Sequence, residues 1–301
     1  MKDAARLLLY LLAVLLCGAL LAPLLFWPGR ELITRGWFPG LAHFEFESYF
    51  HRALLLAALL LLAPLLRSLR VRTRTDLALE KNPLAGADLA AGFSIAAVPL
   101  LCGGLALIAC EIYSLRHPFL WGKMPGVLAA ALAVPILEEL LFRGLILGVL
   151  LRNCSRWNAV LMVSALFSVI HFLKPPRLTT PNESVTWFSG FLSLGHSFWQ
   201  FGDLPLVVAS FFTLFVVGCI LADARILTRS LWLSIGLHSG WIFADGLFSK
   251  IAHRETFALP WIGKDLLVGI VPLTIALASW ALMRCWLNYA GARSQSVSRT
   301  R

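Results

Sequence analysis

The chain has 301 residues, of which 59% are hydrophobic and 14% are charged. About a quarter of the residues of a typical soluble domain are charged, so this composition excludes an ordinary water-soluble globular protein. The net charge of +10 does not indicate nucleic acid as a partner, because the basic residues lie in short segments between apolar runs, as membrane topology requires.

Eight apolar runs of roughly membrane-spanning length follow one another along the chain. A helix needs about 20 apolar residues to cross the hydrocarbon core of a bilayer, and the alternating pattern of a β-barrel is absent. The sequence therefore predicts an all-α polytopic integral membrane protein, a helical bundle of about eight transmembrane helices. The expected spans are 7–27, 50–66, 88–110, 125–150, 158–173, 204–222, 230–247 and 265–288.

The distribution of basic residues predicts the orientation of these spans. Cytoplasmic loops carry an excess of lysine and arginine, and this rule is best met when both termini lie inside the cell. We therefore expect an N-in, C-in protein, and a bacterial cytoplasmic membrane. The inside set would be Lys2, Arg6, Arg67, Arg70, Arg72, Arg74, Lys81, Arg152, Arg156, Arg225, Arg229, Arg284, Arg293, Arg299 and Arg301.

Three ionisable residues lie in the middle of the expected span 125–150: Glu138, Glu139 and Arg143. A charged side chain at the bilayer centre costs about 3 kcal/mol on insertion scales, so such residues are rare and usually functional. Glu139 and Arg143 are four residues apart and share a helix face, where they can pair. Glu138 points about 100° away from Glu139, so one arginine cannot readily serve both carboxylates. A purely structural ion pair is the alternative, but it needs only one glutamate.

Two histidines occur in later apolar runs. His171 follows the run 160–170, and His238 lies in the middle of the span 230–247. One histidine in an apolar helix is more often a packing residue than a catalyst, but two together with an intramembrane glutamate pair favour catalysis. A glutamate can act as a general base toward water, and imidazoles can orient that water, bind a metal ion or donate to an oxyanion.

These segments resemble the motifs of the CPBP family, which includes CAAX prenyl proteases and bacteriocin-processing proteins. The run from Glu138 to Arg143 is similar to the motif E-E-x-x-x-R, and the run from Phe167 to His171 is similar to F-x-x-x-H. His238 lies where the third motif, H-x-x-x-N or H-x-x-x-D, begins. The resemblance covers roughly residues 125–247, which would form a catalytic core between N-terminal helices in 1–124 and a last helix with a basic tail in 248–301, all in one structural domain.

The resemblance implies an intramembrane endopeptidase of the glutamic type. Glu138 would activate water, with Glu139 and Arg143 supporting it, while His171 would position the water and His238 would stabilise the oxyanion. The expected substrate is a membrane-embedded or lipid-anchored protein or peptide, and the expected surroundings are the lipid bilayer. We expect no cofactor; zinc bound by the histidines and a glutamate is the less favoured alternative.

The chain departs from the family pattern at Ile242, where the third motif has asparagine or aspartate. The indole N–H of Trp241 is the nearest candidate for a substitute oxyanion donor. Two other classes of protein stay open. A catalytically silent CPBP-like binding or immunity protein would explain Ile242, and an ion- or proton-coupled transporter would explain the intramembrane charges, although no inverted repeat is evident.

Overall fold

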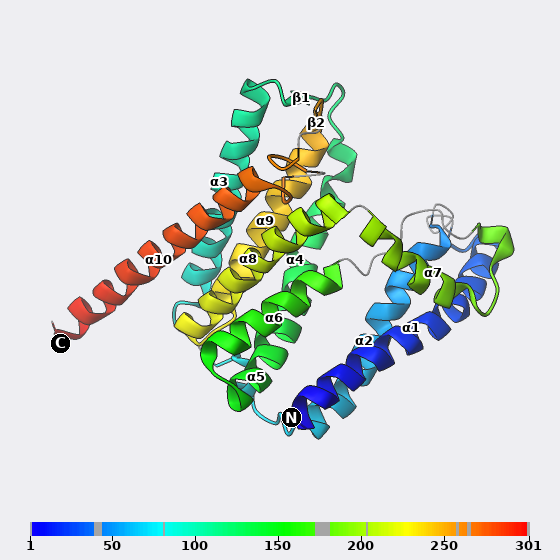
Figure 1. Cartoon of the computed structure of the whole chain (residues 1–301), viewed down its shortest axis with the longest axis horizontal. Helices are drawn as coiled ribbons and strands as arrows, with labels where there is room; N and C mark the ends of the chain where they lie inside the picture. The colour runs from blue at the N-terminus through cyan, green and yellow to red at the C-terminus, as the bar shows by residue number, and fades with distance from the viewer. Residues whose placement is uncertain are drawn as a thin grey trace. The chain divides into compact units, whose positions relative to one another are not determined.

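The computed structural model describes residues 2–38, 44–80, 82–171, 181–202, 204–256, 259–263 and 266–299. This part of the chain is almost entirely helical, which confirms the predicted all-α class (Figure 1). It forms two compact units. The first comprises Met1–Arg72 and Val169–Val207, and the second comprises Thr73–Ser168 and Val208–Arg301. The domain boundaries expected from the sequence stay a prediction.

Five described helices are long and apolar enough to cross a membrane, as expected for a polytopic membrane protein. They coincide with the first, second, third, sixth and eighth expected spans, and α6 (Arg156–His171) is a shorter apolar helix at the fifth. The total of eight spans stays a prediction. The five helices are Ala5–Thr34, Phe46–Ser68, Ala85–Ala109, Leu204–Thr228 and Ile270–Tyr289.

The first unit is held together by aromatic packing between two long helices. The ring of Phe26 packs edge-on against Phe46 and Tyr49, with ring centroids 5.6 Å and 5.3 Å apart. Phe46 and Phe50 are fully buried in the same cluster. The elements of this unit are α1 (Lys2–Thr34), α2 (Phe46–Ser68), η5 (Asn182–Ser184), α7 (Ser189–Ser197) and η6 (Phe198–Gly202).

The second unit contains the segment that carries the glutamate pair. Its helix α9 packs against both α3 and α4 (Figure 1). A short antiparallel ribbon of β1 and β2, with Ser114 opposite His253, joins the segment after α3 to the end of α9. The elements are η2 (Thr75–Leu77), α3 (Ala85–Ala109), β1 (Tyr113–Leu115), η3 (Trp121–Lys123), α4 (Met124–Glu139), η4 (Leu140–Ile146), α5 (Leu147–Asn153), most of α6 and of α8 (Leu204–Thr228), α9 (Trp232–Ile251), β2 (Ala252–Arg254) and α10 (Ile270–Arg299).

Glycines bring the backbones of α3 and α9 into direct contact. A Cβ atom on Gly236 or on Gly240 would collide with the backbone carbonyl of Leu89 or of Phe93, respectively. Small residues four apart are the usual way in which membrane helices pack closely, because apolar side chains gain little by leaving lipid. His238 lies two residues from each glycine, about 200° around the helix, and therefore faces away from α3.

The helix that carries the glutamate pair changes its winding at that point. The α-helical segment α4 ends at Glu139, a seven-residue π-helix follows as η4, and α5 continues from Leu147. The π-helix is a rare and wider form that occurs frequently at functional sites. Arg143 lies within it and is fully buried. The sequence predicted one regular helix over 125–150, whereas the structure has a π-helical segment in its middle.

Candidate active site

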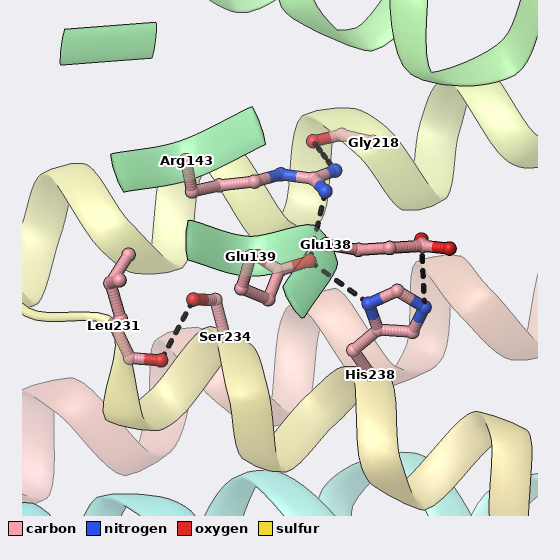
Figure 2. A network of polar contacts seen from close by, with 7 residues as sticks. All are labelled: Glu138, Glu139, Arg143, Gly218, Leu231, Ser234 and His238. Carbon is pink, nitrogen blue, oxygen red and sulfur yellow. Dashed lines mark hydrogen bonds and ion pairs between the residues drawn. The ribbon is translucent and has the colours of Figure 1, made fainter. Parts of the chain in front are cut away.

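Glu139 is the centre of a buried polar network (Figure 2). Its Oε1 atom accepts a hydrogen bond from Nη1 of Arg143 at 2.9 Å and lies 2.9 Å from Nδ1 of His238. The side chains of Glu139 and Arg143 are 0% exposed. The predicted pairing of these two residues is therefore confirmed. Because removal of one partner from a buried ion pair leaves an uncompensated charge, this pair constrains the helix strongly.

Arg143 is fixed by two further contacts that link three helices. Its Nη2 atom donates to the backbone carbonyl of Gly218 in α8 at 3.3 Å, and its guanidinium carbon lies 4.3 Å from the ring centroid of Phe167 in α6. Gly218 sits at a close approach of α8 to α6, where an added Cβ would lie 2.9 Å from the Cβ of Ser164. These contacts could not be predicted from the sequence. Every residue has a backbone carbonyl, so nothing in the sequence marks Gly218 as the acceptor.

Phe167 also contacts the histidine of the network. Its ring packs edge-on against His238, with centroids 5.9 Å apart and an interplanar angle of 75°. The aromatic residue of the F-x-x-x-H pattern thus lies against both Arg143 and His238, and it is 1% exposed. This buried ring covers the guanidinium of Arg143 and packs against the imidazole of His238, which restricts the movement of the imidazole.

The orientation of His238 determines which nitrogen is available for chemistry. A carboxylate that pairs with a guanidinium accepts hydrogen bonds, so Nδ1 of His238 is the donor in its contact with Glu139. In the neutral imidazole, Nε2 then carries the lone pair. This Nε2 atom lies 3.8 Å from Oε2 of Glu138. That separation exceeds a direct hydrogen bond, and the two groups lie close together.

The two neighbouring glutamates occupy different environments. The side chain of Glu138 is 28% exposed, whereas that of Glu139 is 0% exposed. Glu139 is engaged by Arg143, as the spacing of four residues predicted, and by His238, which the sequence did not predict. Glu138 is therefore the carboxylate that a water molecule or a substrate can approach.

The remaining predicted residues are placed as follows. His171 is the half-buried last residue of α6 and belongs to the first unit, whereas Glu138 and His238 belong to the second. Its convergence with them stays a prediction. Trp241 is 4% exposed and follows His238 by one turn of α9, and Ile242 is half-buried beside it. The role of Trp241 as an oxyanion donor also stays a prediction.

The donor atoms of the network bear on the question of zinc. In the part of the chain that the structure describes, no three His, Cys, Asp or Glu side chains are grouped as metal ligands. Glu139 is engaged by Arg143, and Nδ1 of His238 is engaged by Glu139. Glu138 and Nε2 of His238 lie 3.8 Å apart, and His171, the other histidine of the expected zinc set, belongs to the first unit, so the zinc alternative stays a prediction.

These features define a helical membrane protein with a carboxylate–imidazole site inside its helix bundle. Residues 120–244 match the family model of the type II CAAX prenyl endopeptidase, Rce1-like. The match confirms the predicted resemblance to the CPBP family and, at the level of the family, supports a peptidase. The matched segment includes both glutamates, Arg143 and both histidines. No curated protein and no solved structure matches the chain.

Proposed function

We propose that the chain is an intramembrane endopeptidase that hydrolyses a peptide bond with water activated by Glu138. The observation that carries the proposal is the pair of Glu138 and His238. The side chain of Glu138 is 28% exposed, its buried Oε2 atom lies 3.8 Å from Nε2 of the imidazole, and Glu139 contacts Nδ1 of the same ring. A site of this kind can hold one water molecule in contact with a base and a second polar group. The family match supports the same class of reaction.

In the proposed reaction, Glu138 accepts a proton from water while the water oxygen attacks the carbonyl carbon of the scissile peptide. The C–N bond of the tetrahedral intermediate then breaks, and Glu138 returns the proton to the leaving amine. His238 acts in its protonated form throughout: Nε2–H donates to the oxyanion of the intermediate, Nδ1–H remains bound to Glu139, and the imidazole neither gains nor loses a proton. No step runs through a metal ion or a cofactor.

The other parts of the proposal come from the family resemblance, from the departure at Ile242 and from the distribution of basic residues along the chain. His171 would help to position the water, and Trp241 would provide a second donor to the oxyanion. The substrate would be a membrane-embedded or lipid-anchored protein or peptide. The protein would lie in a bacterial cytoplasmic membrane with both termini inside, surrounded by the lipid bilayer and without a nucleic-acid partner.

The test is a comparison of Glu138→Gln with the wild-type protein at matched membrane abundance. Glutamine keeps the shape of the side chain but cannot accept a proton, so we expect turnover to fall by about 10²–10⁴-fold. Membrane proteomes of cells with either version should differ in cleaved peptides, and the variant should retain uncleaved substrate. Glu80→Gln, at an exposed position, is the matched control. Identical cleavage products in both strains would refute the assignment.

Ile242 supports one second candidate, a catalytically silent binding protein. This apolar residue stands where the family motif has a hydrogen-bonding side chain. Under this alternative, Glu138→Gln would retain full function in cells, and no cleavage product would depend on the protein. The same pair of strains therefore distinguishes the two candidates.

A further inference from the structure

A second charged cluster lies near the end of α8, apart from the candidate active site. Asp223 is 5% exposed, and both of its carboxylate oxygens are engaged. Its Oδ1 atom accepts from Nη2 of Arg156 in α6 at 3.0 Å. Its Oδ2 atom accepts from Nη2 of Arg284 at 2.7 Å and from the indole N–H of Trp280 at 2.9 Å, both in α10. One carboxylate thus joins three helices.

The cluster carries more positive than negative charge. Two guanidinium groups converge on one carboxylate, which leaves a net charge of +1. The side chains of Arg156 and Arg284 are 44% and 46% exposed. A guanidinium has five N–H donors in a planar fork, and in the described part of the chain each arginine binds Asp223 through one nitrogen atom. The outward-facing donors can therefore bind an anion.

An apolar groove on α10 leads to this cluster. A cavity of about 310 Å³ is lined by Leu277, Trp280, Ala281 and Arg284. These residues follow one another at helical spacing, so the groove runs along one face of α10 for about 10 Å. Three of its lining side chains are apolar or aromatic, and the fourth, Arg284, is one of the two arginines at Asp223. The groove therefore combines a hydrocarbon surface with a cationic end.

The cluster lies near the ends of two of its helices, where we expect the lipid headgroups to be. Arg156 is the first residue of α6, and Asp223 lies in the last two turns of α8, which ends at Thr228. Arginine at a helix end extends toward the interface while its stem remains in apolar surroundings. Basic pockets between membrane helices at this level are suited to acidic headgroups.

We propose that this cluster and groove form a binding site for an anionic phospholipid. The phosphodiester binds the outward donors of Arg156 and Arg284, and one acyl chain lies along the groove from Ala281 to Leu277. Charge complementarity favours an acidic lipid over a zwitterionic lipid, because the headgroup of the latter brings no net charge. The groove favours a lipid over a soluble phosphate, since only a lipid has a chain to bury.

The experiment uses the full chain purified in a neutral detergent. Retained lipid is measured by native mass spectrometry, and thermal stability is measured during titration with phosphatidylglycerol or with phosphatidylcholine of the same acyl chains. We expect retention of phosphatidylglycerol and an apparent affinity about fivefold or more above that for phosphatidylcholine. Glycerophosphoglycerol and inorganic phosphate, which have no acyl chains, should not compete at equal concentration. Equal affinity for the two lipids, or full competition by phosphate, would overturn the proposal.

Three variants distinguish the contribution of the arginine charge to lipid binding from the contribution of the apolar groove. Arg284→Gln should weaken binding of phosphatidylglycerol by about fivefold, whereas Arg229→Gln, which removes an exposed arginine of the loop after α8, should weaken it by less than twofold. Ala281→Phe fills the groove and keeps both arginines, so it should weaken lipid binding by a similar factor. Equal losses in Arg284→Gln and Arg229→Gln, or no loss in Ala281→Phe, would show general surface attraction rather than a site. If Arg284→Gln fails to fold, the two lipid titrations of the wild-type protein still decide the question.

Discussion

Oε1 of Glu139 lies 2.9 Å from Nδ1 of His238, although the two residues are 99 positions apart in the chain. The same oxygen accepts from Arg143, so one atom connects the π-helix η4 with α9. This relationship directs Nε2 of His238 toward Glu138. We therefore propose that Glu139, the second glutamate of the pair, orients the imidazole and balances the charge of Arg143, while the partly exposed Glu138 acts on the water.

Glu139→Gln should destabilise the protein as well as impair its activity. The substitution leaves Arg143 buried without an ionic partner, and an unpaired buried charge costs about 3–5 kcal/mol. We expect a clearly lower melting temperature in detergent and lower abundance in membranes. Glu80→Gln serves as the control. The double variant Glu139→Gln/Arg143→Met should recover part of the loss, and a single variant as stable as wild type would mean that the pair is not buried.

Trp241→Phe tests whether the indole N–H replaces the oxyanion donor that is missing at Ile242. The change removes the indole N–H together with one ring of a buried side chain, so some loss of stability is expected and turnover is compared at equal amounts of folded protein. If this N–H stabilises the oxyanion, turnover should fall by about 10²–10³-fold, as for loss of one oxyanion donor. Ile242→Asn in the same background should restore part of the activity. Unchanged turnover in Trp241→Phe would exclude the indole from the reaction.

Gly236→Leu should separate α3 from α9 and thereby displace His238. A side chain at this position meets the backbone of Leu89, which cannot move aside as a flexible side chain could. Overpacking of this kind costs about 1–3 kcal/mol or more, and we expect both a lower melting temperature and a loss of activity. Gly126→Ala is the control, because no atom lies within 4 Å of an added Cβ there and alanine favours a helix. Wild-type behaviour of Gly236→Leu would show that the α3–α9 contact does not set the position of His238.

Chelators should leave the proposed activity intact. In the proposed reaction a carboxylate base and hydrogen-bonding imidazoles activate the water, and no metal ion takes part. Purified enzyme treated with 1,10-phenanthroline should therefore cleave its substrate at the untreated rate, and elemental analysis should find less than one zinc ion per chain. Loss of activity that added zinc restores would contradict the proposed mechanism.

Local features of this protein follow from the sequence because they depend on short-range geometry. Apolar runs of about 20 residues predict membrane helices, and five of the expected spans correspond to long apolar helices of the structure. The pairing of Glu139 with Arg143 depends on a spacing of four residues within one segment. The order of Glu138, His171 and His238 along the chain was sufficient to indicate the family, although not the arrangement of these residues in space.

Only the tertiary structure decided which groups meet across helices. The contacts of Glu139 with His238 and of Arg143 with the Gly218 carbonyl depend on the register in which α4, α8 and α9 pack. Close backbone contacts at glycines such as Gly236 and Gly218 set that register, and a sequence does not state which helix a glycine faces. The same holds for Asp223, whose three partners come from α6 and α10. Buried charges are paired in any protein, but the packing of the helices determines which residue becomes the partner.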